Sequence, residues 1–598
     1  MRRTEEDTRP RAARSVRATE AGPWAGVVVL VLLVTLPLLL QRGFALVADM
    51  TFVPTQPWKG EWLGIDGSVP RAVPADALVS LVSQVVAGDL VQKVVLFGSL
   101  LLAGFGVLRL LGGCRPLARF GGAALYVWNA WVFERLAIGH WGLLVGYAAL
   151  PWVVRAAQEV RRRRQGATAR LVLWLAVAAF ASPTGGLLAT LTAVVVVADR
   201  RAWRPTLVVV VGSIAVNLPW LVPALVNPHG GSDPEGVRAF AAAADTPWGT
   251  AGSLLSLGGI WKSAAAPGDR SSWVLAGAAV ALVVGSLVTL VRHPPNAGPS
   301  AGDRRRLLVL GALSFALAYL PATAVGRPLL EFLVGHLLGA GVLRDSQKLL
   351  APFVLVVALG FGLLLERLAD RVGTSDTLAP VGPFLVVLAL APVLVLPSLA
   401  WGLAGRLEPV RYPAEWSQVR DVLDRQPEAV RRTAVFPWST YQRFPWNDRR
   451  AALDPAIRFF PGQVVTSGDL VIDSRTTVAG EDADAGRIGA AVRRHEPLGP
   501  VLAEEGVRFV LLEKTAAGSA SVRLPTGTVL HDGPELMLLD LGNRTRMARS
   551  PHGPLIVAGD VVAVLVLLAA GAAAIRRRGS LPSGRILRGS REHGDVAD

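Results

Sequence analysis

Long apolar runs separated by short polar segments dominate the first 400 residues of the chain. Apolar runs of roughly 17–25 residues are long enough to cross a bilayer as helices. We expect such spans near residues 24–41, 91–111, 118–134, 141–155, 206–225, 272–291, 307–322, 348–366, 381–402 and 554–575. The pattern therefore predicts a multi-pass α-helical membrane protein.

Residues 171–198 form one longer apolar stretch, which Ser-Pro-Thr-Gly-Gly interrupts at 182–186. Arginines flank both ends, so a single span would leave one basic flank outside. Two short helices joined at the interruption keep both flanks inside. With this hairpin the count reaches about 12 transmembrane helices, and both termini are cytoplasmic.

The pattern changes between residues 403 and 553, where apolar runs become short and charge is nearly balanced. This segment predicts helices at 413–426 and 485–495 and strands at 433–438, 507–514 and 535–541. About 150 residues can bury a core of their own. We expect a small extracytoplasmic α/β domain, and the whole chain then divides into a basic tail (1–23), a bundle (24–402) with an outer loop at 42–90, this domain (403–553), a last helix (554–575) and a second basic tail (576–598).

Composition supports the membrane assignment. The 598 residues are 52% hydrophobic and 18% charged, with a mean hydropathy of +0.44. The net charge of +16 comes from arginine clusters such as those at 161–164, 303–306 and 576–578. They fall in alternate loops, which is the positive-inside pattern of membrane topology and not the footprint of a nucleic-acid partner. Arg far outnumbers Lys, and Ala, Gly and Val abound, which is typical of a GC-rich bacterial genome, so we expect a protein of a bacterial plasma membrane. The single cysteine, Cys114, excludes a disulfide framework.

The first outer loop carries the most informative acids. Asp49 follows the first span directly, and Glu61 lies in a loop with Trp58, Trp62 and Lys59. An amphipathic segment at 74–90 is suited to lie flat on the membrane. A carboxylate at the interface can act as a base, and it can equally be an ordinary polar residue at a helix end.

Cations gather at other predicted outer helix ends. Arg135 and His140 lie at a tight turn between two spans, and Arg344 and Lys348 are four residues apart, so they can share a helix face and bind one phosphate. Asp345 lies between the second pair and can bind either cation. The alternative for all four is an interfacial anchor whose charge reaches into the headgroups.

The segment 436–462 interleaves aromatic and polar residues, including Trp438, Tyr441 and Trp446. Together with Trp58 and Trp62, these rings are candidates to stack on the sugars of an acceptor glycan. An aromatic core, or a surface resting on the membrane, explains the segment equally well.

Several sharper motifs are absent from the sequence. There is no P-loop, and the eight histidines are scattered without a zinc motif. We therefore expect no metal ligands and no certain cofactor, with a divalent cation left open.

An acid at the exit of the first helix, followed by a horizontal helix, resembles the GT-C superfamily of membrane glycosyltransferases. The architecture is similar to that of cell-envelope arabinofuranosyl- and mannosyltransferases of high-GC Gram-positive bacteria. This resemblance implies a polyprenyl-phosphate sugar donor, a cell-envelope glycan acceptor, and Asp49 or Glu61 as the general base.

Two other functions stay open at this point. A transporter or flippase of lipid-linked sugars normally carries ionisable residues near the bilayer centre, and Asp560 is the main such residue here. A non-catalytic scaffold of envelope polysaccharide assembly would keep the same fold.

Overall fold

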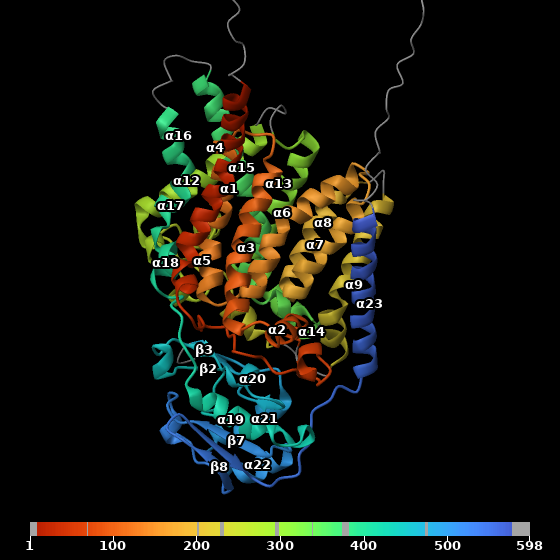
Figure 1. Cartoon of the computed structure of the whole chain (residues 1–598), viewed down its shortest axis with the longest axis vertical. Coiled ribbons are helices and arrows are strands. Elements are labelled where there is room, and N and C mark those ends of the chain that lie inside the picture. The colour runs from red at the N-terminus through yellow and green to blue at the C-terminus, as the bar shows by residue number, and fades with distance from the viewer. Residues whose placement is uncertain are drawn as a thin grey trace, which may run out of the picture.

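The computed structural model describes residues 9–576 apart from 69, 200–202, 228–232, 293–297, 338, 374–381 and 473–475. A bundle of helices occupies one part of the molecule, and a smaller sheet-containing domain covers one end of it (Figure 1). Most of the basic tail predicted at 576–598 and the first eight residues of the chain lie outside the described residues.

Within the described residues, seven helices are long and apolar enough to cross a membrane. Buried residues make up 94% of the span that contains α15 and only 22% of α23, so α15 forms the centre of the bundle and α23 its periphery. The helices involved are α1 (Arg9–Leu40), α3 (Gly88–Leu110), α9 (Trp203–Val226), α12 (Trp273–Arg292), α13 (Ala301–Tyr319), α15 (Ala351–Gly373) and α23 (Gly553–Arg576).

The predicted hairpin is present as two 15-residue helices, α7 (Ala167–Ala181) and α8 (Pro183–Val197). The chain breaks at Ser182, whose hydroxyl accepts a hydrogen bond from the N–H of Gly185 at 2.9 Å. Pro183 occupies the first turn of α8, where its missing N–H costs nothing. The hairpin packs against α6 (Trp141–Arg161).

Two predicted single spans are broken, and the count of 12 is therefore not confirmed. The run at 118–134 divides into α4 (Pro116–Val127) and α5 (Ala130–Ala137), because Asn129 accepts a hydrogen bond from the N–H of Val132 and starts a new helix. The run at 381–402 divides at its prolines into α16 (Gly382–Ala389), α17 (Ala391–Val395), η8 (Pro397–Leu399) and α18 (Ala400–Ala404).

Short helices close the end of the bundle that faces the sheet domain. Among them α2 exposes Leu78 and Leu81, in agreement with the amphipathic segment predicted at 74–90 in the first outer loop, although the helix ends at Ser83. The short elements are η1 (Gly60–Leu63), α2 (Ala75–Ser83), α10 (Glu235–Ala239), α11 (Gly249–Leu255), η2 (Ser263–Ala265), η3 (Gly268–Ser271), η4 (Leu320–Ala322), α14 (Gly326–His336), η5 (Ala340–Leu343) and η6 (Ser346–Leu350).

A five-stranded sheet with the order β4-β1-β7-β9-β8 organises the second domain. Strands β4, β1 and β7 are parallel, and β9 is antiparallel to both of its neighbours. The five elements predicted from the sequence are all present, as α19 (Ala414–Asp424), β1 (Arg432–Phe436), α21 (Ala483–Arg493), β7 (Phe509–Glu513) and β9 (Leu536–Asp540). The sequence did not predict β4 (Gln463–Val465), β8 (Thr528–Asp532), α20 (Ala456–Phe459), α22 (Leu498–Glu504), η9 (Glu428–Val430), η10 (Pro445–Asn447), η11 (Ser519–Ser521) or the two-residue strands β2 (Tyr441–Gln442), β3 (Ala452–Leu453), β5 (Leu470–Val471) and β6 (Thr477–Val478).

The sheet has a separate core on each face. Val435 of β1 packs in the cluster around Trp416 of α19, whereas its neighbours Ala434 and Phe436 pack in the cluster around Ile488 of α21. This alternation follows from the two-residue period of a strand. Both faces are apolar, so β1 is a central buried strand.

The loop after α1 joins the bundle to the sheet domain. Phe44 pairs with Val410 and Ala48 pairs with Ala452 through isolated β-bridges. An ion pair of 2.9 Å between Asp76 of α2 and Arg458 of α20 adds a buried contact. The sheet domain is thereby held over the chain segment that contains Asp49.

Candidate active site

Asp49 lies in this junction and is held by side chains from two distant parts of the chain. Its Oδ2 is 3.1 Å from Nε2 of His140, and its Oδ1 accepts a hydrogen bond from the hydroxyl of Tyr441. The Asp49 side chain nevertheless keeps 40% of its surface exposed. A hydroxyl of a bound molecule can therefore reach the carboxylate.

Glycine at position 139 allows the turn before His140 to approach Asp49. The N–H of Asp49 donates to the carbonyl of Ile138 at 3.2 Å, and Gly139 has a φ of 76°. A Cβ at position 139 would lie 2.2 Å from the backbone nitrogen of Met50. Only glycine fits this backbone conformation and this space.

Arg135 fixes the orientation of the His140 ring. A guanidinium can only donate, so its Nη1, 3.1 Å from Nδ1 of His140, makes Nδ1 an acceptor. The proton of the neutral ring is then on Nε2 and points at Asp49. Arg135 itself is completely buried, and it also pairs with Asp345 at 3.1 Å and with Gln347. In this arrangement Arg135 is a positioning residue with no exposed surface for a phosphate.

Lys348 is close enough to Asp49 for its charge to lower the pKa of that carboxylate. Its Nζ lies 3.4 Å from Asp345, which it shares with Arg135, and its side chain is 23% exposed. Lys262, over the ring of Tyr441 at 5.7 Å, is a second cation of this group. The structure therefore places positive charge next to the candidate base.

The pKa of Asp49 lies below its ordinary value. Burial alone raises this pKa, but the hydrogen bonds from His140 and Tyr441 and the charges of His140 and Lys348 stabilise the carboxylate more strongly. Burial and the neighbouring cations lower the pKa of His140 to about 4. At neutral pH the pair is thus a carboxylate and a neutral imidazole.

The sequence predicted that Arg344 and Lys348 could share a helix face, but the structure places them on different segments. Arg344 directly follows the 3-10 segment η5, Lys348 lies in η6, and the chain bends between them at Asp345. Arg344 forms an ion pair of 2.9 Å with Glu481 of the sheet domain. Of the predicted phosphate ligands, only Lys348 and His140 adjoin Asp49.

Glu61 belongs to a different environment from Asp49. Burial raises the pKa of Glu61 to about 8 and lowers that of Lys59 to about 8, with the attraction between the two opposing both shifts. Trp62 is 3% exposed and donates to the carbonyl of Pro57, so it is a core residue, whereas Trp58 is half exposed. Trp58 is therefore the available ring of the first outer loop.

The aromatic residues of the sheet domain serve mainly its cores. Trp446 packs among Phe444 and Trp416, with ring centroids 4.8 and 5.8 Å away, and Trp438 packs beside Phe436. Tyr441 alone of the three candidates contacts Asp49. The aromatic-core interpretation thus explains Trp438 and Trp446, and Tyr441 belongs to the site.

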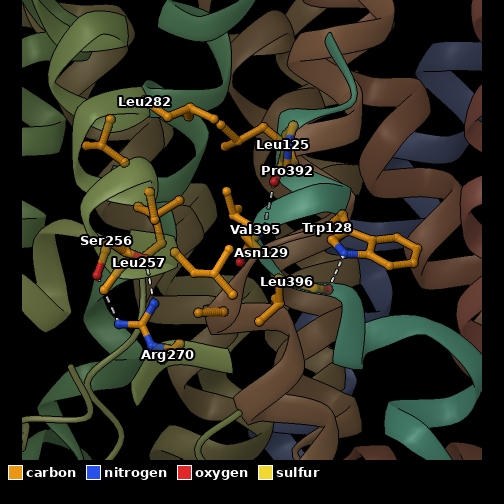
Figure 2. A pocket seen from close by; sticks show the side chains of 15 residues that line it. Leu125, Trp128, Asn129, Ser256, Leu257, Arg270, Leu282, Pro392, Val395 and Leu396 are labelled. Atoms are coloured by element: carbon orange, nitrogen blue, oxygen red, sulfur yellow. Dashed lines mark hydrogen bonds between the residues drawn. The ribbon is translucent and has the colours of Figure 1, made fainter. Parts of the chain in front are cut away.

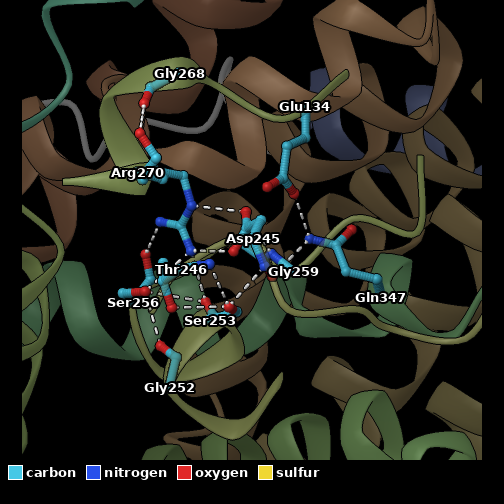
Figure 3. A network of polar contacts seen from close by, with 12 residues as sticks. Glu134, Asp245, Thr246, Gly252, Ser253, Ser256, Gly259, Gly268, Arg270 and Gln347 are labelled. Carbon is cyan, nitrogen blue, oxygen red and sulfur yellow. Dashed lines mark hydrogen bonds and ion pairs between the residues drawn. The ribbon is translucent and has the colours of Figure 1, made fainter. Parts of the chain in front are cut away.

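A buried polar network supports the site from inside the bundle (Figure 3). Gln347 donates to Glu134 at 2.8 Å and to the carbonyl of Gly258 at 3.1 Å, and Arg270 pairs with Asp245 at 2.7 Å. No local sequence pattern marks these residues as part of a site. The rarity of lysine could have drawn attention to two residues of the site. The chain contains only five lysines, and both Lys262 and Lys348 lie near Asp49.

A separate, mostly apolar cavity of about 40 Å³ opens beside this network (Figure 2). It lies between α4, α12 and α17, and Asn129, Ser256 and Arg270 supply its polar wall. None of the residues that contact Asp49 lines it. Within the described residues there is no group of three or more His, Cys, Asp or Glu side chains that could hold a metal ion.

Solved structures share this fold. The single-particle cryo-EM structure of the arabinofuranosyltransferase AftD from mycobacteria is similar with a TM-score of 0.56 and 15% identity, over 89% of this chain and 40% of that one. A mutant of the same protein gives a TM-score of 0.55 and 16% identity over 89% and 42%. No protein-family model and no curated protein sequence matches the chain. The chain therefore shares its fold with this arabinofuranosyltransferase, and it spans about two fifths of the length of the solved structures.

Proposed function

We propose that this protein is a membrane glycosyltransferase that moves a sugar from a polyprenyl-phosphate donor to a cell-envelope glycan or glycolipid on the outer face of the membrane. The observation that carries the proposal is the half-exposed carboxylate of Asp49, held by His140 and Tyr441 beside Lys348. The fold shared with an arabinofuranosyltransferase adds support and makes a pentose donor the first to test.

Each group near Asp49 has a role in this reaction. The acceptor hydroxyl attacks the anomeric carbon of the sugar, the bond from that carbon to the phosphate oxygen breaks, and the hydroxyl proton passes to Asp49. Lys348 neutralises the charge of the leaving polyprenyl phosphate. His140 and Tyr441 hold the carboxylate in place, and the lipid tail keeps the phosphate at the depth of the interface.

Glu61 is the second candidate for the base. Its raised pKa leaves it largely protonated at neutral pH, so it accepts a proton only after losing its own. Asp49 is ionised over the whole physiological range. We therefore assign the base to Asp49.

Asp49→Asn tests the assignment, because asparagine keeps the size of the side chain and removes the base. Purified protein in nanodiscs is given polyprenyl-phosphate arabinofuranose, then other polyprenyl-phosphate sugars, with oligosaccharide acceptors. We expect Asp49→Asn to lose transfer by on the order of 100-fold or more with donor binding retained. Asp89→Asn is the matched control, since among the described residues the one ion pair of Asp89, at the start of α3, is with Lys93, and it should keep wild-type activity.

The other functions predict different results. Normal turnover in both Asp49→Asn and Glu61→Gln would remove the two carboxylates from catalysis. Wild-type protein that binds the donors without transferring any sugar would favour a scaffold. Donor crossing of the bilayer without transfer, measured in proteoliposomes, would favour a flippase.

A further inference from the structure

A second cavity, lined by charged side chains, lies at the end of the bundle opposite the sheet domain. Its volume is about 240 Å³, and its polar wall consists of Arg109, Arg155, Gln158, Glu159, Arg162, Arg164 and Asp303. Helix α6 begins beside Asp49, and its residues from Arg155 onward line this cavity. Arg155 and Glu159 lie 14 and 18 positions after Trp141, a rise of about 21–27 Å. The cavity is therefore most of a bilayer thickness away from the candidate active site.

Both carboxylates of the cavity already have arginine partners. Glu159 pairs with Arg170 at 2.7 Å and with Arg155 at 3.5 Å. Asp303 is fully buried and pairs with Arg161 and, at 2.9 Å, with Arg162. Each acid is thus shared by two cations, and the cavity keeps an excess of positive charge.

Two further arginines of the wall have no carboxylate partner among the described residues. The guanidinium of Arg109 lies over the ring of Trp24 at 5.0 Å. Arg164 is exposed, and its backbone N–H donates to the carbonyl of Glu159. Both guanidinium groups are free to bind an anion, for which arginine has a suitable planar array of donors.

The remaining wall is apolar. Leu110, Leu307 and Leu359 line the cavity beneath the arginines, and Trp24 lies beside it in α1, as tryptophans do at a membrane interface. A free anion would use only the arginines. A molecule with a charged head and apolar chains would use both surfaces.

We propose that this cavity binds the phosphate-bearing headgroup of an anionic phospholipid from the leaflet at that end of the bundle. Basic pockets between transmembrane helices are suited to such headgroups. The site is separate from glycosyl transfer and would hold the ends of α3, α6 and α13 together. Free inorganic phosphate is the competing ligand with the same chemistry.

Native mass spectrometry of the purified full chain tests the proposal, with phosphatidylglycerol and phosphatidylcholine of identical chains as probes. The variant Arg109→Gln with Arg164→Gln should bind phosphatidylglycerol about tenfold more weakly than wild type. Arg163→Gln with Arg292→Gln is the matched control, because it removes two exposed arginines outside the cavity. The control should bind as wild type does.

A lysine double variant separates binding from folding. Arg109→Lys with Arg164→Lys keeps both charges and should remain within about threefold of wild type. Equal losses in the control pair, or equal binding of phosphatidylcholine by wild type, would refute the site. Full displacement of phosphatidylglycerol by millimolar inorganic phosphate would assign the cavity to free phosphate and overturn the headgroup proposal.

Discussion

The pH dependence of transfer separates the two candidate bases. A base must be ionised, and Asp49 is ionised well above its pKa, which lies below the ordinary 3.8. His140, with a pKa of about 4, also stays in one form between pH 6 and 8. If Asp49 is the base, kcat/KM is therefore flat over this range.

Glu61 would give a steep profile instead. With a pKa of about 8, about 1% of Glu61 would be ionised at pH 6 and about half at pH 8, a rise of roughly 50-fold in kcat/KM. The measurement is initial transfer rate at low donor concentration from pH 6 to 8, in wild type and Glu61→Gln. We expect kcat/KM to change by no more than about twofold between pH 6 and 8 in both proteins. A rise of more than about tenfold in wild type that is absent from Glu61→Gln would refute the assignment to Asp49.

Two further predictions concern the phosphate and the topology. Lys348→Ala should raise KM for the donor about tenfold, because it removes one favourable charge contact with the phosphate. Arg344→Ala should raise KM less, because Arg344 pairs with Glu481, and equal increases of KM in steady-state kinetics would contradict this geometry. Reporter fusions at about residues 300 and 480 should report opposite sides of the membrane, and the same side for both would reject the proposed orientation.

Local sequence patterns predicted where helices and strands occur better than whether each long apolar run forms one unbroken helix. The hairpin at Ser182 and the strand at 433–438 were predictable because turn residues and strand periodicity are local signals. Asn129 breaks the predicted span at 118–134 because its side chain caps the start of α5. Hydropathy alone does not reveal this cap, since Asn129 lies inside an apolar run. Pro392 and Pro397 are helix-breaking residues inside the run at 381–402. The run was nevertheless predicted as one span because the residues around both prolines are apolar.

The candidate site was predictable only in parts. The sequence placed Asp49 and His140 at separate outer helix ends, with different roles, and the fold brings them to 3.1 Å. Tyr441 is 392 residues from Asp49, and no local pattern links positions so far apart. Burial was equally hidden for Arg135, because an arginine at a turn between spans looks the same in sequence whether it faces headgroups or the interior.

The low pKa of Asp49 fits a base whose strength depends on the donor. In the free site Lys348 and the hydrogen bond from His140 stabilise the carboxylate, so it accepts a proton poorly. A donor phosphate beside Lys348 would neutralise that lysine and add a negative charge of its own, and both changes raise the pKa of Asp49. The acid limb of kcat, which reports the donor complex, should therefore lie at higher pH than that of kcat/KM, which reports the free enzyme. Down to pH 4, kcat/KM of wild type should therefore stay flat with respect to Asp49 while kcat falls. A kcat that also stays flat would show that the phosphate binds away from Lys348, and Lys348→Ala should remove the difference between the two profiles.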